Sequence, residues 1–523
     1  MTRLKKKDRN NRNDRRDRFS TQGSTRYQEP ADDSYYEDEF YENSNGQEDV
    51  KKKKRGGKEY AIIAYVFVAI FISLIGWMVY FNVYRSAEFI NSPYNKRQNT
   101  FADRVVRGDL LSSDGEVLAT TQVDEEGNET RVYPYENMFA HVIGYASNGK
   151  SGLESEANFQ LLTSHDFILT RITNEIREEK NLGDNVVTTL DSRLQSAAYS
   201  ALGDYNGAVV VLEPSTGKVL AMVSKPTFNP NTIESDWDSI VSDDSNSVLV
   251  NRVTQGLYPP GSTFKIVTTL AYLREHGSLD GFSYDCSGTI QPVDGNLIHC
   301  YDSISHGAED LPLAFENSCN CAFCQIGLEL GHSRLNETAN DLMFNSKLPL
   351  DITYNQSQFN LKKDSGDAYT MLTSIGQGDT LVTPMHMAMI VSSIANGGTL
   401  MKPYLIDHVE NVNGDQVSKE MPDSYKKLMT SQEAATLSGL MEQVVTNGTA
   451  SGLAGQGYTA AGKTGSAEYY VGDEMHTHSW FVGFSNVENP DLVVAVIAEG
   501  AGTGSSVAVP IARDIFNTYY SYS

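Results

Sequence analysis

The chain has 523 residues, of which 40% are hydrophobic, and it carries a formal net charge of −25 at pH 7. This length allows two or three domains with a large core. The acidic balance argues against a surface that binds nucleic acid or anionic lipid broadly. We therefore expect no nucleic-acid partner, and function must be sought in local motifs.

Residues 1–58 are polar and contain almost no aliphatic side chains. This segment is basic at both ends and acidic and tyrosine-rich between them. Such a composition cannot bury enough apolar surface to fold alone. We expect a disordered tail, either a solvated leader or a regulatory segment that touches lipid headgroups or a partner.

An uncharged apolar run follows at residues 60–84. Twenty-five residues at about 1.5 Å each extend roughly 37 Å as a helix, enough to cross a bilayer core of about 30 Å. The basic stretch at residues 51–58 precedes the run, whereas only Arg85 follows it closely. Because basic flanks stay in the cytoplasm, we expect a single-pass transmembrane helix with a cytoplasmic N-terminus and residues 85–523 outside.

The chain beyond this helix divides into two predicted domains. Residues 85–184 are mixed in character and predict a small pedestal domain, with a strand, turn and strand at 106–121 and a helix at Ser155–Glu179. Residues 185–523 form the larger domain. Its start predicts a strand, a helix and then a hairpin at 207–224, where two apolar runs flank a Pro-Ser-Thr-Gly turn.

The larger domain has strands at both ends and helices between them. This order predicts an α+β fold, with an antiparallel sheet assembled from distant segments beside a helical lobe. The expected later elements are helices at Thr263–Glu275, Pro384–Ala395 and Ser431–Val445, three strands between Tyr458 and Gly500, and a final helix at Ser506–Tyr519.

Five cysteines lie in the larger domain: Cys286, Cys300, Cys319, Cys321 and Cys324. An odd count leaves at least one thiol unpaired. The stretch "SCNCAFC" could suggest metal ligands, but no His or Cys pair at zinc spacing completes a set of four. We therefore expect no metal, and a disulfide between Cys286 and Cys300 stays open.

Ser-x-x-Lys occurs four times in the chain, starting at Ser147, Ser215, Ser262 and Ser424. The first two lie in glycine-rich turns and the last in a polar loop. Only Ser262 is followed by a sustained helical pattern, so it is either a helix N-cap or a nucleophile. On a helix, positions i and i+3 are neighbours, which brings Lys265 to the serine as a base.

Two further motifs follow in order. Ser318-Cys319-Asn320 is the one Ser-x-Asn of the chain, and Lys463-Thr464-Gly465 falls on a predicted strand. Either triplet alone is weak evidence for a catalytic site. The two triplets follow Ser262 and Lys265 in this order, and their predicted helix and strand contexts fit. Together the three motifs strongly indicate that their residues line one cleft.

With these motifs the sequence resembles the penicillin-binding proteins, whose transpeptidase domains carry Ser-x-x-Lys, Ser-x-Asn and Lys-Thr/Ser-Gly. Further stretches match, among them "NRVTQGLYPPGSTFK", "SIGQGDTLVTPMHMAMIVSSIANGG" and "SWFVGFS". The likeness runs from about residue 91 to the C-terminus. It is closest to the monofunctional class B type, because the chain has no room for a glycosyltransferase domain. Ser466 after the third motif, where Thr is more usual, is a minor departure.

The resemblance implies the penicillin-recognising serine transpeptidase fold and acyl transfer on the D-Ala-D-Ala end of peptidoglycan stem peptides. Ser262 would attack the penultimate D-Ala carbonyl, Lys265 would take its proton, and Ser318 would relay a proton to the leaving nitrogen. β-Lactams would be covalent inhibitors. A membrane glycosyltransferase of the RodA/FtsW type is the expected partner in the bacterial cell membrane.

The same resemblance assigns substrate-binding roles. Asn320 would bond the substrate amide, while Lys463 and Thr464 would hold its terminal carboxylate. Gly465 would keep the strand open, and the backbone N–H of Ser466 would join that of Ser262 in an oxyanion hole. No cofactor is implied.

Three rival functions share some of these features. A class A β-lactamase would need a deacylating Glu four residues before Asn336, where His332 stands instead. A β-lactam sensor would need a cytoplasmic signalling domain. A catalytically idle scaffold of a wall-building complex is the alternative from a different class, and three intact motifs argue against it.

Overall fold

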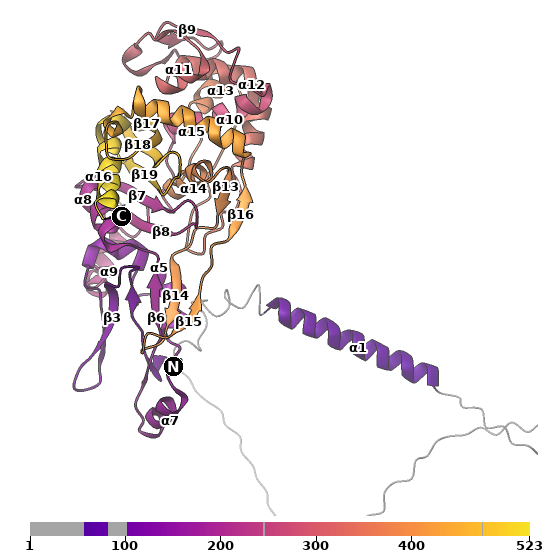
Figure 1. Ribbon diagram of the computed structural model, residues 1–523, viewed down its shortest axis with the longest axis vertical. Coiled ribbons are helices and arrows are strands. Elements are labelled where there is room, and N and C mark those ends of the chain that lie inside the picture. Colours follow the sequence, from indigo (N-terminus) through magenta and orange to yellow (C-terminus); the bar gives the residue numbers. More distant parts are fainter. Residues whose placement is uncertain (1–56, 82–101, 244–245, 473, 523) are drawn as a thin grey trace, which may run out of the picture. The chain divides into compact units, whose positions relative to one another are not determined.

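The computed structural model describes residues 57–81, 102–243, 246–472 and 474–522 (Figure 1). The chain forms two compact units, residues 1–86 and 87–523. The predicted tail up to residue 56 lies outside the described residues, as do residues 82–101, which hold the end of the predicted span and the start of the predicted pedestal.

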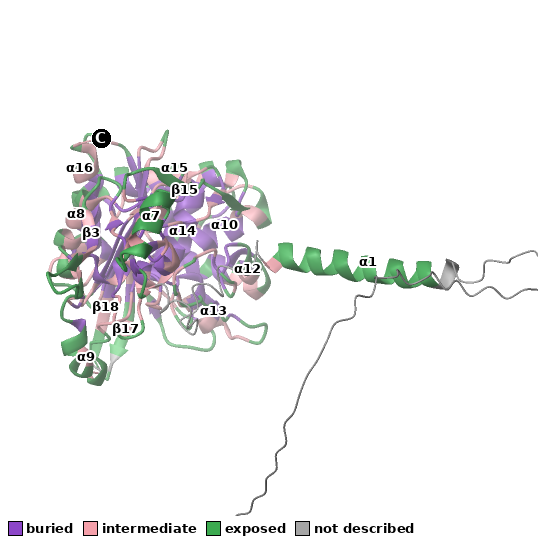
Figure 2. Cartoon of the chain, turned by 90° about the horizontal axis from the view of Figure 1, so that it is seen from below, coloured by how far each residue is buried: buried purple, intermediate pink, exposed green. Residues whose placement is uncertain are grey.

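The first unit contains helix α1 (Gly57–Tyr80). Its segment Tyr60–Tyr80 has 21 residues and a mean hydropathy of 2.6, so it is long and apolar enough to cross a membrane. Its large apolar side chains are exposed (Figure 2). Among the described residues, α1 is the one helix that meets these criteria, and it is consistent with a single-pass membrane anchor.

A six-stranded sheet forms the end of the second unit at which α7 and β15 lie in Figure 1. Its order is β15-β14-β6-β2-β3-β4, and only the β2–β6 pair is parallel. The antiparallel pairing of β2 with β3 confirms the predicted hairpin at 106–121. The strands are β2 (Leu110–Leu111), β3 (Val117–Val123), β4 (Glu129–Val132), β6 (Asn185–Thr188), β14 (Ile406–Glu410) and β15 (Gln416–Lys419).

Two strands of this sheet come from far along the chain. β14 pairs antiparallel with β6 through partners such as Val409 and Val186, and β15 then pairs with β14. Sequence analysis missed both strands, because β15 is exposed at all four positions and shows no apolar alternation. A segment of the larger domain therefore completes the sheet of the smaller one.

The predicted helix at Ser155–Glu179 is wrong, since it is replaced by short helices: α5 (Gly152–Glu156), α6 (Asn158–Leu161) and α7 (Ile168–Ile176). The break falls at His165, whose backbone N–H donates to the Asp184 carboxylate at 2.9 Å and whose ring lies against the same group. This side-chain bond competes with helical bonding and holds the segment as a loop.

A buried ion triad joins α5 to the sheet. Arg107 and Arg131 donate to the two carboxylate oxygens of Glu154 at 2.6 and 2.7 Å, and the Glu154 side chain is fully buried. Although burial disfavours the charged carboxylate, the two guanidinium groups hold the pKa of Glu154 below its usual value.

The larger domain is built on a five-stranded antiparallel sheet of order β17-β18-β19-β7-β8. Every residue of β7 and β19 is buried. Helices α8 (Ser192–Leu202) and α16 (Val509–Tyr520) lie on one side of the sheet and α14 (Pro384–Ala395) on the other (Figure 1). The strands are β7 (Gly207–Leu212), β8 (Val219–Lys225), β17 (Ala460–Val471), β18 (Glu474–Ser485) and β19 (Leu492–Ala498).

A helical lobe adjoins this sheet, and the α+β prediction is confirmed. Figure 2 shows α10 and α14 in the buried interior. The predicted helices at 384–395 and 431–445 match α14 and α15 closely, whereas the 22-residue α12 was not predicted. The lobe helices are α10 (Lys265–His276), α11 (Leu311–Glu316), α12 (Asn320–Asp341), α13 (Asp367–Ser374) and α15 (Ser431–Thr446).

Short elements complete the described chain. They are β1 (Val105–Val106), η2 (Glu136–Phe139), α4 (Ala140–Ile143), β5 (Asn181–Leu182), α9 (Ile233–Ser242), η3 (Gly261–Phe264), β9 (Tyr284–Cys286), β10 (Thr289–Ile290), β11 (Ile298–His299), η4 (Tyr301–Ser303), β12 (Gly307–Glu309), β13 (Thr399–Met401), β16 (Ser424–Lys427), η5 (Ser451–Leu453) and η6 (Gly504–Ala508).

We predict that Glu154→Gln destabilises the second unit by about 3 to 5 kcal/mol, because the change leaves two buried guanidinium groups without their anion. Urea-induced unfolding of the detergent-solubilised chain measures this loss. Glu125→Gln, at an exposed turn position, is the matched control and should leave the midpoint in place. Equal midpoints for the two variants would contradict the prediction.

Candidate functional site

The turn that carries Ser262 lies directly before α10. Gly261 has φ +52°, and its N–H donates to the Gly376 carbonyl at 2.9 Å. A Cβ added at Gly261 would lie 2.9 Å from the carbonyl oxygen of Ser466, so the turn packs closely against β17. Neither η3 nor α10 has a side-chain N-cap, so the Ser262 hydroxyl is not used as one.

Lys265 is completely buried at the start of α10. Its amine donates to the carbonyl and hydroxyl oxygens of Ser318 at 2.6 and 3.2 Å, and to Oδ1 of Asn320 at 2.8 Å. These contacts join the first two motifs. Within the described residues no hydrogen bond links Ser262 to Lys265, so the role of Lys265 as the base for Ser262 stays a prediction.

Ser318 is where all three motifs meet. Its hydroxyl accepts a second bond from the amine of Lys463 at 2.8 Å, and Lys463 is itself completely buried on β17. Ser318 has φ +56°, in the left-handed region that a serine rarely adopts. Such backbone strain, held in place by surrounding bonds, is typical of functional sites.

Burial shifts both lysines. It lowers the pKa of Lys265 to about 8, against the opposing effect of nearby cysteine thiols, of which Cys319 is the first. Burial also holds the pKa of Lys463 well below its usual value, and the charge of Lys265 lowers it further. Among the described residues neither amine has a carboxylate partner within ion-pair distance.

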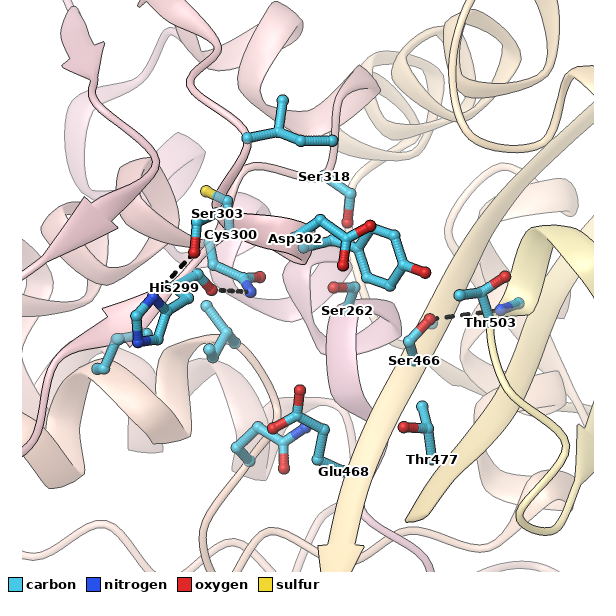
Figure 3. A pocket seen from close by; sticks show the side chains of 18 of the residues that line it. Ser262, His299, Cys300, Asp302, Ser303, Ser318, Ser466, Glu468, Thr477 and Thr503 are labelled. Carbon is cyan, nitrogen blue, oxygen red and sulfur yellow. Dashed lines mark hydrogen bonds between the residues drawn. The ribbon is translucent and has the colours of Figure 1, made fainter. Parts of the chain in front are cut away.

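A cavity of about 920 Å³ opens in front of these groups (Figure 3). Figure 3 shows Ser262, Ser318 and Ser466 together at its wall, with Ser466 on the neighbouring strand. The two buried lysines lie behind this wall. The predicted site residues that line the cavity are Ser262, Ser318, Asn320, Thr464, Gly465 and Ser466.

The β17 side of the cavity is tightly packed. A Cβ at Gly465 would lie 3.0 Å from the carbonyl oxygen of Pro260, from Thr263 and from Trp480, so a side chain here would force these neighbours to shift by a few tenths of an ångström. The hydroxyls of Thr464 and Thr449 are 2.6 Å apart. β17 is the outer strand of the five-stranded sheet, so its free backbone edge can face a ligand.

Sequence reasoning did not single out several cavity residues. Thr449 lines the cavity but carries no chemical signal of its own in the sequence. The N–H of Gly504 donates to the Ser466 hydroxyl at 3.4 Å, and residues 296–304 form a further wall. These segments reach the cavity only through the tertiary fold, so no local pattern could have identified them.

Sequence spacing shows no set of four ligands among the cysteines, but the fold brings three of them together with a histidine. The metal-ligating atoms of Cys286, Cys300, His306 and Cys319 all lie within 4.8 Å of one another. All five cysteines are free thiols, and the sulfurs of Cys286 and Cys300 are 3.7 Å apart. His306 was overlooked because its spacing to the cysteines fits no common zinc pattern.

Comparison with known proteins bears on both domains. The penicillin binding protein transpeptidase domain matches residues 207–517, which is more than half of the chain. The penicillin binding protein A dimerisation domain matches residues 107–186. The region of the predicted pedestal therefore matches a described domain of the same proteins.

The chain is similar to curated and solved relatives over most of its length. It is 32% identical over 434 residues to the peptidoglycan D,D-transpeptidase PbpA of Mycolicibacterium smegmatis, covering 77% of this chain and 87% of the relative. The penicillin-binding protein A of M. tuberculosis, solved as a ceftriaxone acyl-enzyme complex, has a TM-score of 0.74 at 29% identity. That alignment covers 80% of this chain and 99% of the other.

A third match is the D,D-transpeptidase domain of a peptidoglycan glycosyltransferase from Eggerthella lenta, with a TM-score of 0.73 and 30% identity over 80% of this chain and 99% of the other. The fold and the three converging motifs define a penicillin-recognising serine enzyme. The chain belongs to the penicillin-binding protein transpeptidase family.

Proposed function

We propose that the chain is a peptidoglycan D,D-transpeptidase that crosslinks stem peptides through an acyl-enzyme on Ser262. The observation that carries this proposal is the convergence of two buried amines on the Ser318 hydroxyl, with Ser262 in the same cavity. The acyl-enzyme formed by the M. tuberculosis relative supports it.

Acylation begins with loss of the Ser262 proton. Lys265 in its neutral form is the base, because burial lowers its pKa to about 8 and leaves part of the population unprotonated near neutral pH. The serine oxygen then attacks the penultimate D-Ala carbonyl. Backbone N–H groups of Ser262 and Ser466 stabilise the oxyanion that forms.

Ser318 completes the proton transfer. A hydroxyl has two acceptor sites and one proton, and in Ser318 both acceptor sites receive lysine N–H bonds. Its own proton is therefore free to pass to the leaving D-Ala nitrogen while the protonated Lys265 amine replaces it. The C–N bond breaks, D-Ala leaves as an amine, and an amine of a neighbouring strand later takes the acyl group.

The β17 side binds the substrate. The terminal carboxylate lies near Thr464 and is stabilised by the amine of Lys463, whose pKa rises when this anion enters. Asn320 bonds the substrate amide, and the free edge of β17 at Gly465 is open to the substrate. No cofactor takes part in these steps.

The membrane arrangement follows from the flanking charges. The N-terminus is cytoplasmic, residues 85–184 form an external pedestal and residues 185–523 the external catalytic domain. The match of residues 107–186 to the dimerisation domain supports this division, although β14 and β15 join the pedestal sheet.

Protease added to intact protoplasts should digest the catalytic domain, and protection of this domain would overturn the proposed orientation.

A monofunctional transpeptidase needs glycan made by another enzyme, and a RodA/FtsW-type polymerase is the partner that we propose. Residues 107–118 of the pedestal and the membrane helix are the expected contacts, but Leu110 and Leu118 are buried and the exposed residues 113–116 are Ser, Asp, Gly and Glu. Helix α7 is a better candidate than residues 107–118 for the surface that contacts the polymerase, because its apolar residues Ile168, Leu169 and Ile176 are exposed.

We predict that Ser262→Ala lowers covalent labelling by fluorescent penicillin by on the order of 10³-fold or more, because the acyl group loses its attachment atom. Labelling of the purified membrane fraction measures this. Ser215→Ala, in another Ser-x-x-Lys turn, is the control and should label normally. Labelling that survives in Ser262→Ala would exclude Ser262 as nucleophile, and an unlabelled wild-type chain would favour the idle scaffold.

The rate of acylation should rise with pH, reach half of its maximum near pH 8 and level off above about pH 9, since only neutral Lys265 accepts the proton. Between pH 7 and 8 we expect a roughly fivefold increase in the second-order labelling rate. Lys265→Arg, which stays protonated, should be slow at every pH. A flat wild-type profile would argue that Lys265 is not the base.

For the partner, we predict that Ile172→Asp on α7 lowers co-purification with the polymerase, because a charge enters the exposed apolar face. Ile172 is exposed, so the fold should survive, and unchanged penicillin labelling verifies this. A chain in which residues 60–80 are exchanged for an unrelated span tests the membrane part. Unchanged co-purification in both variants would reject the partnership through these two elements.

A further inference from the structure

One charged side chain of the cavity has no part in the mechanism above. Glu468 follows Ser466 by two residues on β17, and Figure 3 shows its side chain reaching from that strand into the cavity. It is exposed, and among the described residues its carboxylate forms no hydrogen bond or ion pair. A carboxylate without a partner at the wall of a binding cavity is open to a ligand of opposite charge.

The charged groups around the cavity are separated by sign. Among the described residues, those that line it include two carboxylates, Asp302 and Glu468, but no lysine or arginine. The amines of Lys265 and Lys463 lie behind the wall, where both contact Ser318. A ligand that matches both regions carries a carboxylate at the lysine side and a cation at another point of its length.

The position of Glu468 on its strand indicates which part of a donor peptide it meets. Thr464, Ser466 and Glu468 are alternate residues of β17, so their side chains share one face of the strand. The proposed mechanism places the terminal carboxylate near Thr464 and the penultimate carbonyl near the N–H of Ser466. A peptide that pairs with the free edge of β17 therefore runs antiparallel to it and continues toward Glu468.

In this register the residue directly before D-Ala-D-Ala lies closest to Glu468. Two strand positions span roughly 7 Å, which is the distance along β17 from Ser466 to Glu468. The cavity extends in the same direction, because Thr477, opposite Glu468 on β18, and Met475, two residues from it, also line the cavity. This end of the cavity suits a long side chain with an apolar stem and a charged tip.

The reaction itself supplies the cation. Crosslinking needs an amine on the acceptor strand, and both strands are built from the same stem peptide, so the donor carries this amine as well. We propose that Glu468 binds the protonated side-chain amine of the donor stem peptide, on the residue directly before D-Ala-D-Ala. The substrate class is then a peptide with a diamino acid at this position. This inference rests on the proposed function, since the donor must bind along β17.

Asp302 is the other carboxylate that lines the cavity, and it lies on a different wall. It belongs to η4, within residues 296–304, and not to β17. The register of a peptide on the edge of β17 leads to Glu468 and gives no reason for a contact with Asp302. Asp302 is therefore the comparison residue in the test.

Two penicillins test the contact during acylation, before any acceptor strand takes part. Their acyl chains have equal length and end either in a primary amine or in a methyl group, at the place that the donor side chain takes. We expect the wild-type chain, purified in detergent, to react about two- to fivefold faster with the amine, as one exposed ion pair allows. The ratio of the two rates should fall to about one in Glu468→Gln and below one in Glu468→Lys.

The ratio is measured within each variant, so poor folding lowers both rates together and leaves their ratio in place. Glu474→Gln is the matched control, because Glu474 is an exposed carboxylate at the start of β18 outside the cavity lining, and its ratio should equal that of the wild type. Equal rates in the wild type, a preference that survives in Glu468→Gln, or one lost only in Asp302→Asn would overturn the proposal. Absence of labelling by both penicillins would instead reject the proposed function.

Discussion

Two buried lysine amines, which have no carboxylate partner in the part of the chain that the structure describes, are the constraint on which the site depends. An ammonium group has three N–H donors, and in a dry interior each needs an acceptor. For Lys265 these acceptors are the carbonyl and hydroxyl oxygens of Ser318 and the amide oxygen of Asn320. The positions of the second motif are therefore set by the hydrogen-bonding needs of the first.

The same constraint accounts for the strained backbone at Ser318. A left-handed conformation costs a non-glycine residue on the order of 1 to 3 kcal/mol. Here it aims both the carbonyl and the hydroxyl of one residue at Lys265 while the hydroxyl also reaches Lys463. Charge-assisted bonds to buried amines, at about 1.5 to 3 kcal/mol each, can offset that cost. Loss of either lysine would leave the strain without its compensation.

Local and short-range features were predictable from the sequence, and long-range ones were not. The three motifs, the hairpin at 207–224 and the helix at Pro384–Ala395 each follow from spacing or apolar pattern within a few residues. The pairing of β14 with β6 joins segments that have no mutual signal in one sequence. His306 escaped notice for the same reason, because only the pairing of β9 with β12 brings it to Cys286.

The sequence Ser-Cys-Asn places one residue of the cysteine cluster between two residues of the proposed reaction. Alternating positions before a helix point in different directions, so Ser318 and Asn320 meet the lysines while the Cys319 sulfur faces Cys300. The loop at Cys300 therefore packs directly against the residue between Ser318 and Asn320. Asn320 also donates to the carbonyl of His299, so the wall and the motif are joined at a second point. The cavity wall and the second motif are thus joined at two points, one on each side of the Cys319–Asn320 peptide bond.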